Sequence, residues 1–264
     1  MKAINFSGGF DCTNCTQQQL QTLAANGKFY IQFINLAKTS NVDTLWVFAA
    51  NNSGAELKQS SPARLSTLID NVASVSGVDS QNRLAFPILC QVAFDYGQGV
   101  TVAAPDVDIF SDVPGGGFDD GTISIGGLPL ETCAATGTSF AAPYVTGVAG
   151  LMLSKKSDLT ASAMKATICE TSDKTGSFDP TGNEVKLLDA FQAVQKSLTP
   201  GLDDQFDCRA LNDARWVTTI VPSAVGVVAV QNQELEMTKV SSGSGYMGLA
   251  TRCKVSGDFD VQVD

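Results

Sequence analysis

Short runs of apolar residues alternate with segments of helical periodicity along the first two thirds of the chain. Residues 44–50 form a continuous apolar and aromatic run, and residues 3–8, 73–78 and 100–104 are further short segments that indicate strands. A continuous apolar run is typical of a strand in a parallel sheet whose two faces are both covered. These runs predict four strands of one sheet.

The segments between the runs predict helices. Residues 16–25, 28–39 and 62–71 are the candidates, and the second has apolar side chains at helical spacing in Phe29, Phe33, Leu36 and Ala37. Residues 139–150 are apolar on every side, which is typical of a buried helix. Alternating strands and helices predict an α/β fold with a parallel sheet and flanking helices.

The character of the sequence changes near residue 198. Pro200 and Gly201, with polar neighbours, indicate a linker. Beyond it, short apolar runs at residues 216–220, 225–230, 234–239, 247–251 and 259–263 are separated by turn-rich spacers, as in a β-sandwich. We therefore expect an α/β unit over residues 1–197, a linker over 198–203 and the start of a β-sandwich module over 204–264, a short and incomplete all-β segment.

Composition narrows the classes of function. The formal net charge of −10 and a pI near 4.4 argue against nucleic-acid binding, which requires basic patches. No run of eighteen apolar residues occurs, so we expect no membrane span. We also expect no signal peptide, because Met1 and Lys2 lead directly into a predicted interior strand.

Seven cysteines are present, and Cys12 and Cys15 form the one CxxC pair. A zinc site needs four ligands, and the chain has neither a second pair nor a histidine. We expect no metal or cofactor, and the pair is interpreted either as a loop disulfide or as two structural thiols.

The candidate chemistry lies where Gly137, Thr138 and Ser139 lead into the apolar helix. Free N–H groups and the positive end of a helix dipole favour negative charge beside Ser139. Pro143 falls near the end of the first turn, where it removes at most one helical hydrogen bond. The alternative is an N-cap serine that only begins a core helix.

Residues 137–147 resemble the nucleophile motif of the subtilisin-like serine peptidases, the subtilases. Further segments resemble that family in the same order. Residues 4–9 match the strand that lines the substrate cleft, 46–54 the strand and turn with the oxyanion asparagine, and 94–105 the stretch upstream of the nucleophile. Residues 159–168 and 187–194 match the two helices that follow it. The resemblance covers residues 3–197 and implies part of a subtilisin-like sheet.

The resemblance also implies roles for single residues. Ser139 matches the nucleophile, and Asn52 matches the side-chain donor of the oxyanion hole, the site that binds the charged oxygen of the tetrahedral intermediate. Asn51 replaces the glycine that usually precedes that donor. The walls of the substrate cleft are matched by Ser7, Gly8 and Gly9 on one side and by Ala49 and Ala50 on the other.

Two members of the family's catalytic triad have no counterpart. The triad runs in the order Asp, His, Ser, but only three residues precede the predicted cleft strand and the chain contains no histidine. Serine is a weak nucleophile without a base, and loss of the histidine alone lowers turnover of a subtilisin by about 10⁶-fold. We therefore expect a fragment that is inactive by itself and needs the missing N-terminal half of the catalytic domain. Without that half, residues 4–6 or a neighbouring strand become an exposed apolar edge, which predicts poor solubility.

Three functions stay open. The first is a fragment of a secreted serine endopeptidase that acts on polypeptides, for which the family implies an extracellular location. The second is a peptide-binding protein without catalysis. In the third, the α/β part is a scaffold for a β-module that binds carbohydrate or a surface partner, since residues 206–216 and 257–261 are similar to the opening of concanavalin-like modules.

Overall fold

The computed structural model describes residues 2–40, 42–84, 93–112 and 135–198 in full, and elsewhere gives only the course of short strands. The central element is a six-stranded sheet in the order β1-β3-β5-β6-β12-β11. Neighbouring strands are parallel except for the antiparallel pair of β11 and β12. The strands are β1 (Ala3–Phe6), β3 (Leu45–Ala49), β5 (Val72–Val78), β6 (Val102–Pro105), β11 (Asp173–Phe178) and β12 (Glu184–Leu187).

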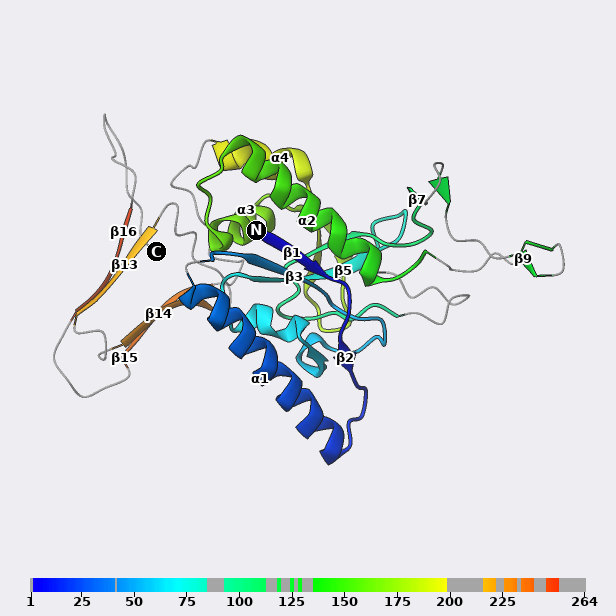
Figure 1. Ribbon diagram of the computed structural model, residues 1–264, viewed down its shortest axis with the longest axis horizontal. Coiled ribbons are helices and arrows are strands. Elements are labelled where there is room, and N and C mark those ends of the chain that lie inside the picture. The colour runs from blue at the N-terminus through cyan, green and yellow to red at the C-terminus, as the bar shows by residue number, and fades with distance from the viewer. Residues whose placement is uncertain are drawn as a thin grey trace.

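Helices cover both faces of this sheet, which confirms the α/β prediction (Figure 1). The helices α2 (Thr138–Lys155), α3 (Ala161–Glu170) and α4 (Ala190–Leu198) pack on one face, where Val145, Met152 and Met164 meet the buried side chains of β3 and β5. The long helix α1 (Gln17–Thr39) packs on the other face, where Ile34 lies in a cluster with Trp46 and Phe48. Each face of β3 is therefore buried, as its continuous apolar sequence predicted.

The two helices predicted at residues 16–25 and 28–39 are one helix. Thr16 begins α1 with a capping box, in which its hydroxyl accepts from the N–H of Gln19 and the Gln19 side chain accepts from the N–H of Thr16. Asn26 and Gly27 are the two residues that separated the predicted helices. A Cβ at Gly27 would lie 2.9 Å from Arg64 Nη2, so glycine is present there because another side chain packs against the helix.

Two other predicted helices were also placed wrongly. Residues 62–71 contain only the short 3₁₀ helix η2 (Ala63–Thr67), because the chain enters β5 at Val72. Residues 187–194 are divided between β12 and α4, since Leu187 pairs with Ala103 of β6 and α4 begins only after Asp189. The helix at residues 159–168 begins two residues later than predicted, at Ala161, capped by Thr160.

Among the described residues, β1 is an edge strand that pairs with β3 alone. This agrees with the expected edge at residues 4–6, although Phe6 is only partly exposed because its ring contacts Tyr30 and Phe48 edge to face. The predicted poor solubility stays a prediction.

Cys12 and Cys15 form a disulfide in the loop between β2 (Phe10–Asp11) and α1, so the first of the two interpretations of this pair is confirmed. In the described part of the chain, no helix combines the length and the apolar character that a membrane crossing requires.

The strands after residue 200 fall where the sequence predicted them. Strands β13 (Trp216–Val221), β14 (Gly226–Gln231), β15 (Glu234–Lys239) and β16 (Tyr246–Thr251) pair antiparallel as β13 with β16 and β14 with β15. Residues 259–263 and the linker at 198–203 lie mostly or wholly outside the described residues, so the domain boundaries stay predictions.

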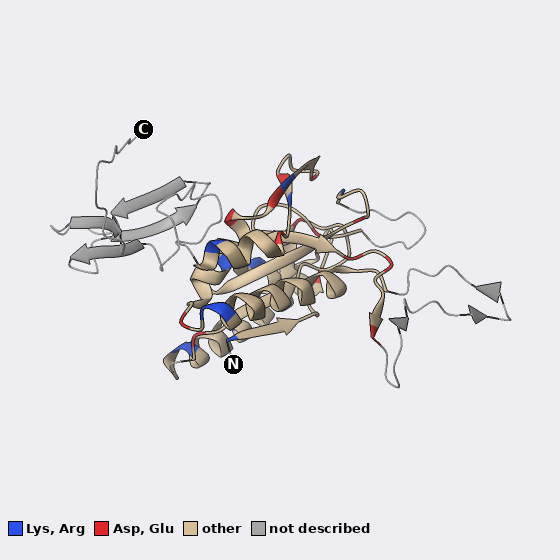
Figure 2. Ribbon diagram, turned by 90° about the horizontal axis from the view of Figure 1, so that it is seen from above, with Lys and Arg blue, Asp and Glu red and all other residues tan. Residues whose placement is uncertain are grey.

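Among the described residues, Asp and Glu lie mainly in the segments that connect strands and helices, whereas the charged positions of the helices are mostly Lys (Figure 2). In the four helices, Glu170 is the one acidic residue. In the described part of the chain, the acidic residues thus belong mainly to connecting segments.

Candidate functional site

Ser139 lies in the first turn of α2, at the position the sequence predicted. Gly137 precedes the helix with φ of +142°, a conformation that glycine adopts without strain. The N–H of Gly137 donates to the carbonyl of Asp106 at 2.9 Å, which ties the start of α2 to the end of β6. In the first turn of a helix the N–H groups have no partner within the helix, so the N–H of Ser139 is available to a ligand.

Pro143 explains why Ser139 is linked to the predicted cleft strand. Proline has no N–H and cannot donate to the carbonyl four residues earlier, which belongs to Ser139. The hydroxyl of Ser7 takes its place and donates to that carbonyl at 2.9 Å. In return, Ser139 Oγ donates to the carbonyl of Ser7 at 3.4 Å. Two hydrogen bonds therefore fix the distance between Ser139 and the segment that follows β1.

Asn52 is held next to Ser139 by Thr138, the residue before it. The Oδ1 atom of Asn52 accepts from the N–H of Thr138 at 2.9 Å and from its hydroxyl at 3.1 Å. The same hydroxyl accepts from the N–H of Asn51 at 3.1 Å. Because Oδ1 is occupied, the amide nitrogen Nδ2 of Asn52 is left as the donor that can serve a ligand. Sequence reasoning gave Thr138 no role, although it lies inside the recognised motif.

Asn51 adopts φ of +88°, a region that side chains other than glycine rarely occupy. A positive φ is expected at this position, because the family usually has glycine there. Asparagine tolerates such angles better than most residues, and the hydrogen bond from its N–H to Thr138 fixes the turn despite the missing glycine.

The proposed cleft residues surround Ser139 and Asn52 in different ways. Ser7 and Gly9 are exposed, and Gly8 is partly exposed. A Cβ on Gly9 would lie 2.7 Å from Asn51 Oδ1, so the two cleft segments approach each other closely there. Ala49 and Ala50 are buried, with exposures of 2% and 0%. Only their backbone can therefore meet a ligand.

No base is placed beside the serine in the part of the chain that the structure describes. The partner recorded for the Ser139 hydroxyl is the carbonyl of Ser7, and the sequence contains no histidine. Most of the segment at residues 113–134, which precedes Ser139 in the chain, lies outside the described residues.

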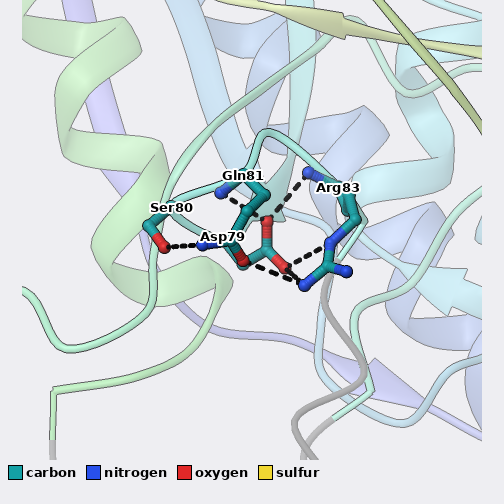
Figure 3. A network of polar contacts seen from close by, with 4 residues as sticks. All are labelled: Asp79, Ser80, Gln81 and Arg83. Atoms are coloured by element: carbon teal, nitrogen blue, oxygen red, sulfur yellow. Dashed lines mark hydrogen bonds and ion pairs between the residues drawn. The ribbon is translucent and has the colours of Figure 1, made fainter.

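The buried carboxyl of Asp106 lies directly behind the start of α2. Its side chain is fully buried, and among the described residues neither of its oxygens has a hydrogen-bond partner. Burial, together with a smaller effect of the negative charge of Asp79, raises the pKa of Asp106 to about 9. Asp79 is itself bound by Arg83 and the N–H of Gln81 (Figure 3). Burial acts to raise the pKa of Asp79, but these hydrogen bonds outweigh it and keep that pKa below its usual value.

Asp106 is expected to make the protein less stable as the pH rises. In the folded chain it holds its proton up to about pH 9, whereas the model-compound pKa is 3.8. Between these values unfolding releases a proton, so a higher pH favours the unfolded state, by up to about 1.4 kcal/mol per pH unit. Burial raises the pKa of Asp95 to about 6, so Asp95 contributes to this loss of stability with rising pH only below pH 6.

The measurement is urea unfolding at several pH values between 6 and 9. Asp106→Asn should flatten the slope in this window. Asp108→Asn is the matched control, because Asp108 is exposed and its φ of +51° suits asparagine. An unchanged slope in Asp106→Asn would contradict the assignment.

Comparison with known proteins agrees with this geometry. A model of the subtilase family matches residues 1–191. Subtilisin DY from Bacillus licheniformis is 31% identical over 134 residues, which is 49% of this chain and 40% of that protein. The cell wall-associated protease of Bacillus subtilis is 26% identical over 148 residues, 50% of this chain and 15% of that protein. The chain thus covers less than half of either relative.

Among solved structures, a cold-adapted subtilisin-like serine proteinase aligns with a TM-score of 0.49 at 23% identity, over 71% of this chain and 54% of that one. The family model alone spans well over half of the sequence and includes Ser7, Asn52 and Ser139. The chain belongs to the subtilase family.

Proposed function

We propose that this chain supplies the nucleophile and the oxyanion-binding half of a serine endopeptidase site that hydrolyses polypeptides. The observation that carries the proposal is the anchoring of Asn52. Thr138 occupies its Oδ1 atom, which leaves Nδ2 as a donor beside the first turn of α2 that bears Ser139.

The chemistry follows from these positions. Ser139 Oγ attacks the scissile carbonyl carbon, and the carbonyl oxygen takes up negative charge in the tetrahedral intermediate. Asn52 Nδ2 and the N–H of Ser139 are the donors for that oxygen, and fixed donors of this kind stabilise developing charge strongly. An extended peptide pairs with the backbone at Ser7, Gly8 and Gly9, as in strand addition, while Ala49 and Ala50 offer backbone groups on the other side.

The proton of Ser139 must go to a base that this chain does not contain. Its sequence has no histidine, so the base comes from outside these residues and the chain by itself is expected to be inactive. In support of a division of the site between segments, the chain spans less than half of its relatives, and β1 leaves a sheet edge free among the described residues.

We also propose an extracellular location. One relative is named for the cell wall, and a disulfide such as Cys12–Cys15 persists in oxidising compartments.

The test supplies the missing base in solution. A fluorophosphonate should label Ser139 slowly, and imidazole should accelerate this reaction. A Ser139 Oγ–phosphorus bond forms, the phosphorus–fluorine bond breaks, and imidazole takes the serine proton. A positioned general base contributes about 10²–10⁴-fold, of which free imidazole recovers part. Intact-mass spectrometry follows the labelling, and Ser139→Ala measures the background. If imidazole brings no Ser139-dependent labelling, catalysis is excluded and the peptide-binding alternative is favoured.

A further inference from the structure

The loop that carries Asn52 is fixed from two sides. Thr138 holds it on the side of the nucleophile, as described above. On the opposite side lies Asp95, which belongs to the stretch at residues 94–105 that was matched to the segment upstream of the nucleophile. Its side chain is fully buried at 0% exposure.

The carboxylate of Asp95 accepts hydrogen bonds from residues that follow Asn52 in the chain. Its Oδ1 atom accepts from the N–H of Ser53 at 3.1 Å, from the hydroxyl of Ser53 at 3.2 Å and from the N–H of Ala55 at 2.9 Å. Its Oδ2 atom accepts from the hydroxyl of Ser60. A carboxylate that accepts several hydrogen bonds at once fixes its donors more strongly than a neutral acceptor does.

The backbone of Asp95 completes the arrangement on the other side of Asn52. The N–H of Asp95 donates to the carbonyl of Asn51 at 3.0 Å. Its own carbonyl accepts from the hydroxyl of Ser76 at 2.7 Å, which ties it to β5. One buried residue therefore bonds the backbone groups immediately before and immediately after Asn52 and connects them to the central sheet.

We propose that Asp95 is the positioning residue of the oxyanion hole: it holds the Asn51–Ala55 loop so that Asn52 Nδ2 points at the reacting oxygen. Asp95 is fully buried and bonds the residues on either side of Asn52, so its effect on the reaction runs through the placement of Asn52. This inference rests on the proposed function for its catalytic consequence, whereas the placement of Asn52 can be measured without any reaction.

Substitutions separate the carboxylate's charge from its geometry. Asp95→Asn keeps an acceptor oxygen for Ser53 and Ala55, and its amide can donate to the hydroxyl of Ser60. Asp95→Ala removes every side-chain contact. We expect Asp95→Asn to keep the imidazole-assisted labelling rate of Ser139 within about threefold, and Asp95→Ala to lower it by about 10–100-fold, because a displacement of about 1 Å can cost 10²-fold.

A double variant distinguishes positioning from a general loss of structure. If Asp95 acts through Asn52, Asp95→Ala should lower the rate in the wild-type background and have no further effect when Asn52 is already alanine. An equal loss in both backgrounds would overturn the proposal. The matched control is Asp179→Ala, which removes a carboxylate that holds the β11–β12 turn through the N–H groups of Thr181 and Asn183. It should leave the rate unchanged.

The side-chain amide signals of Asn52 in ¹H–¹⁵N NMR give a readout that needs no reaction. Asp95→Ala should move them toward the position of a free amide, whereas Asp95→Asn should not. In the unmodified chain they should shift with a midpoint near pH 6, where Asp95 titrates, and Asp95→Asn should abolish this shift. The other charged group that influences Asp95 is Asp11 of β2, so Asp11→Asn should keep the shift.

The NMR arm also applies if Asp95→Ala does not fold, because the titration uses the unmodified chain. Failure of Ser139 labelling combined with the expected NMR shifts would remove the proposed function and keep the positioning role. If the Asn52 signals do not shift as Asp95 titrates, the positioning role is overturned.

Discussion

Replacement of Asn52 by alanine is expected to slow the imidazole-assisted labelling of Ser139 by about 10²–10³-fold, a magnitude established on a subtilisin rather than on this chain. The reason is geometric. Thr138 holds Asn52 by its oxygen, so the alanine variant removes the donor that would stabilise the charged oxygen of the transition state. The rate is measured by intact-mass spectrometry at fixed imidazole concentration.

Asn52→Asp is the informative companion. It keeps an Oδ1 acceptor for both hydrogen bonds from Thr138, so the loop stays anchored, but it replaces the donor by an oxygen. We expect a loss at least as large as that in Asn52→Ala. A rate near that of the unmodified chain in Asn52→Asp would show that the amide donor contributes nothing and would remove Asn52 from the proposed site.

Replacement of Gly77 by alanine is expected to destabilise the fold by about 3 kcal/mol or more, at the upper end of what overpacking costs. Gly77 lies in β5, and a Cβ there would lie 1.3 Å from Oδ2 and 1.9 Å from Cγ of Asp106. The fully buried carboxyl of Asp106 would have to move. Asp106 also accepts a hydrogen bond from the N–H of Gly137 at the start of α2 through its backbone carbonyl, so the displacement would reach that helix. Urea unfolding measures the loss.

The contact itself is tested by a double variant. In an Asp106→Ala background, Gly77→Ala should cost much less, because the overlapping atoms are gone. Gly147→Ala and Gly150→Ala in α2 are the matched controls, since a Cβ at either position meets nothing within 4 Å. Alanine is favoured over glycine in a helix by about 0.5–1 kcal/mol, so these variants should be slightly more stable. Equal losses in all three variants would contradict the packing argument.

Much of the fold follows from local patterns. The sequence located β1, β3, β5 and β6, and the continuous apolar run of β3 is the clearest signal because a strand covered on both faces has no polar face to interrupt it. The apolar segment after Ser139 located α2, and four of the five strands predicted after residue 200 occur where expected. Errors arose where a local signal competed with packing. Asn26 and Gly27 predicted a break that α1 does not have, because Arg64, nearly forty residues later in the chain, packs against Gly27.

For the candidate site, too, some features follow from the sequence and others from tertiary packing. The sequence by itself determined the family and the absence of histidine, and it singled out Ser139 and Asn52 as candidates, since these depend on residue types and their order. Only the tertiary structure showed that Thr138 orients Asn52, that Ser7 replaces the donor missing at Pro143, and that Asp95 and Asp106 are buried carboxyls behind the site. The contacts of Ser7 and Thr138 join residues 132 and 86 positions apart, and no local pattern encodes them because the fold alone brings their partners within hydrogen-bonding distance.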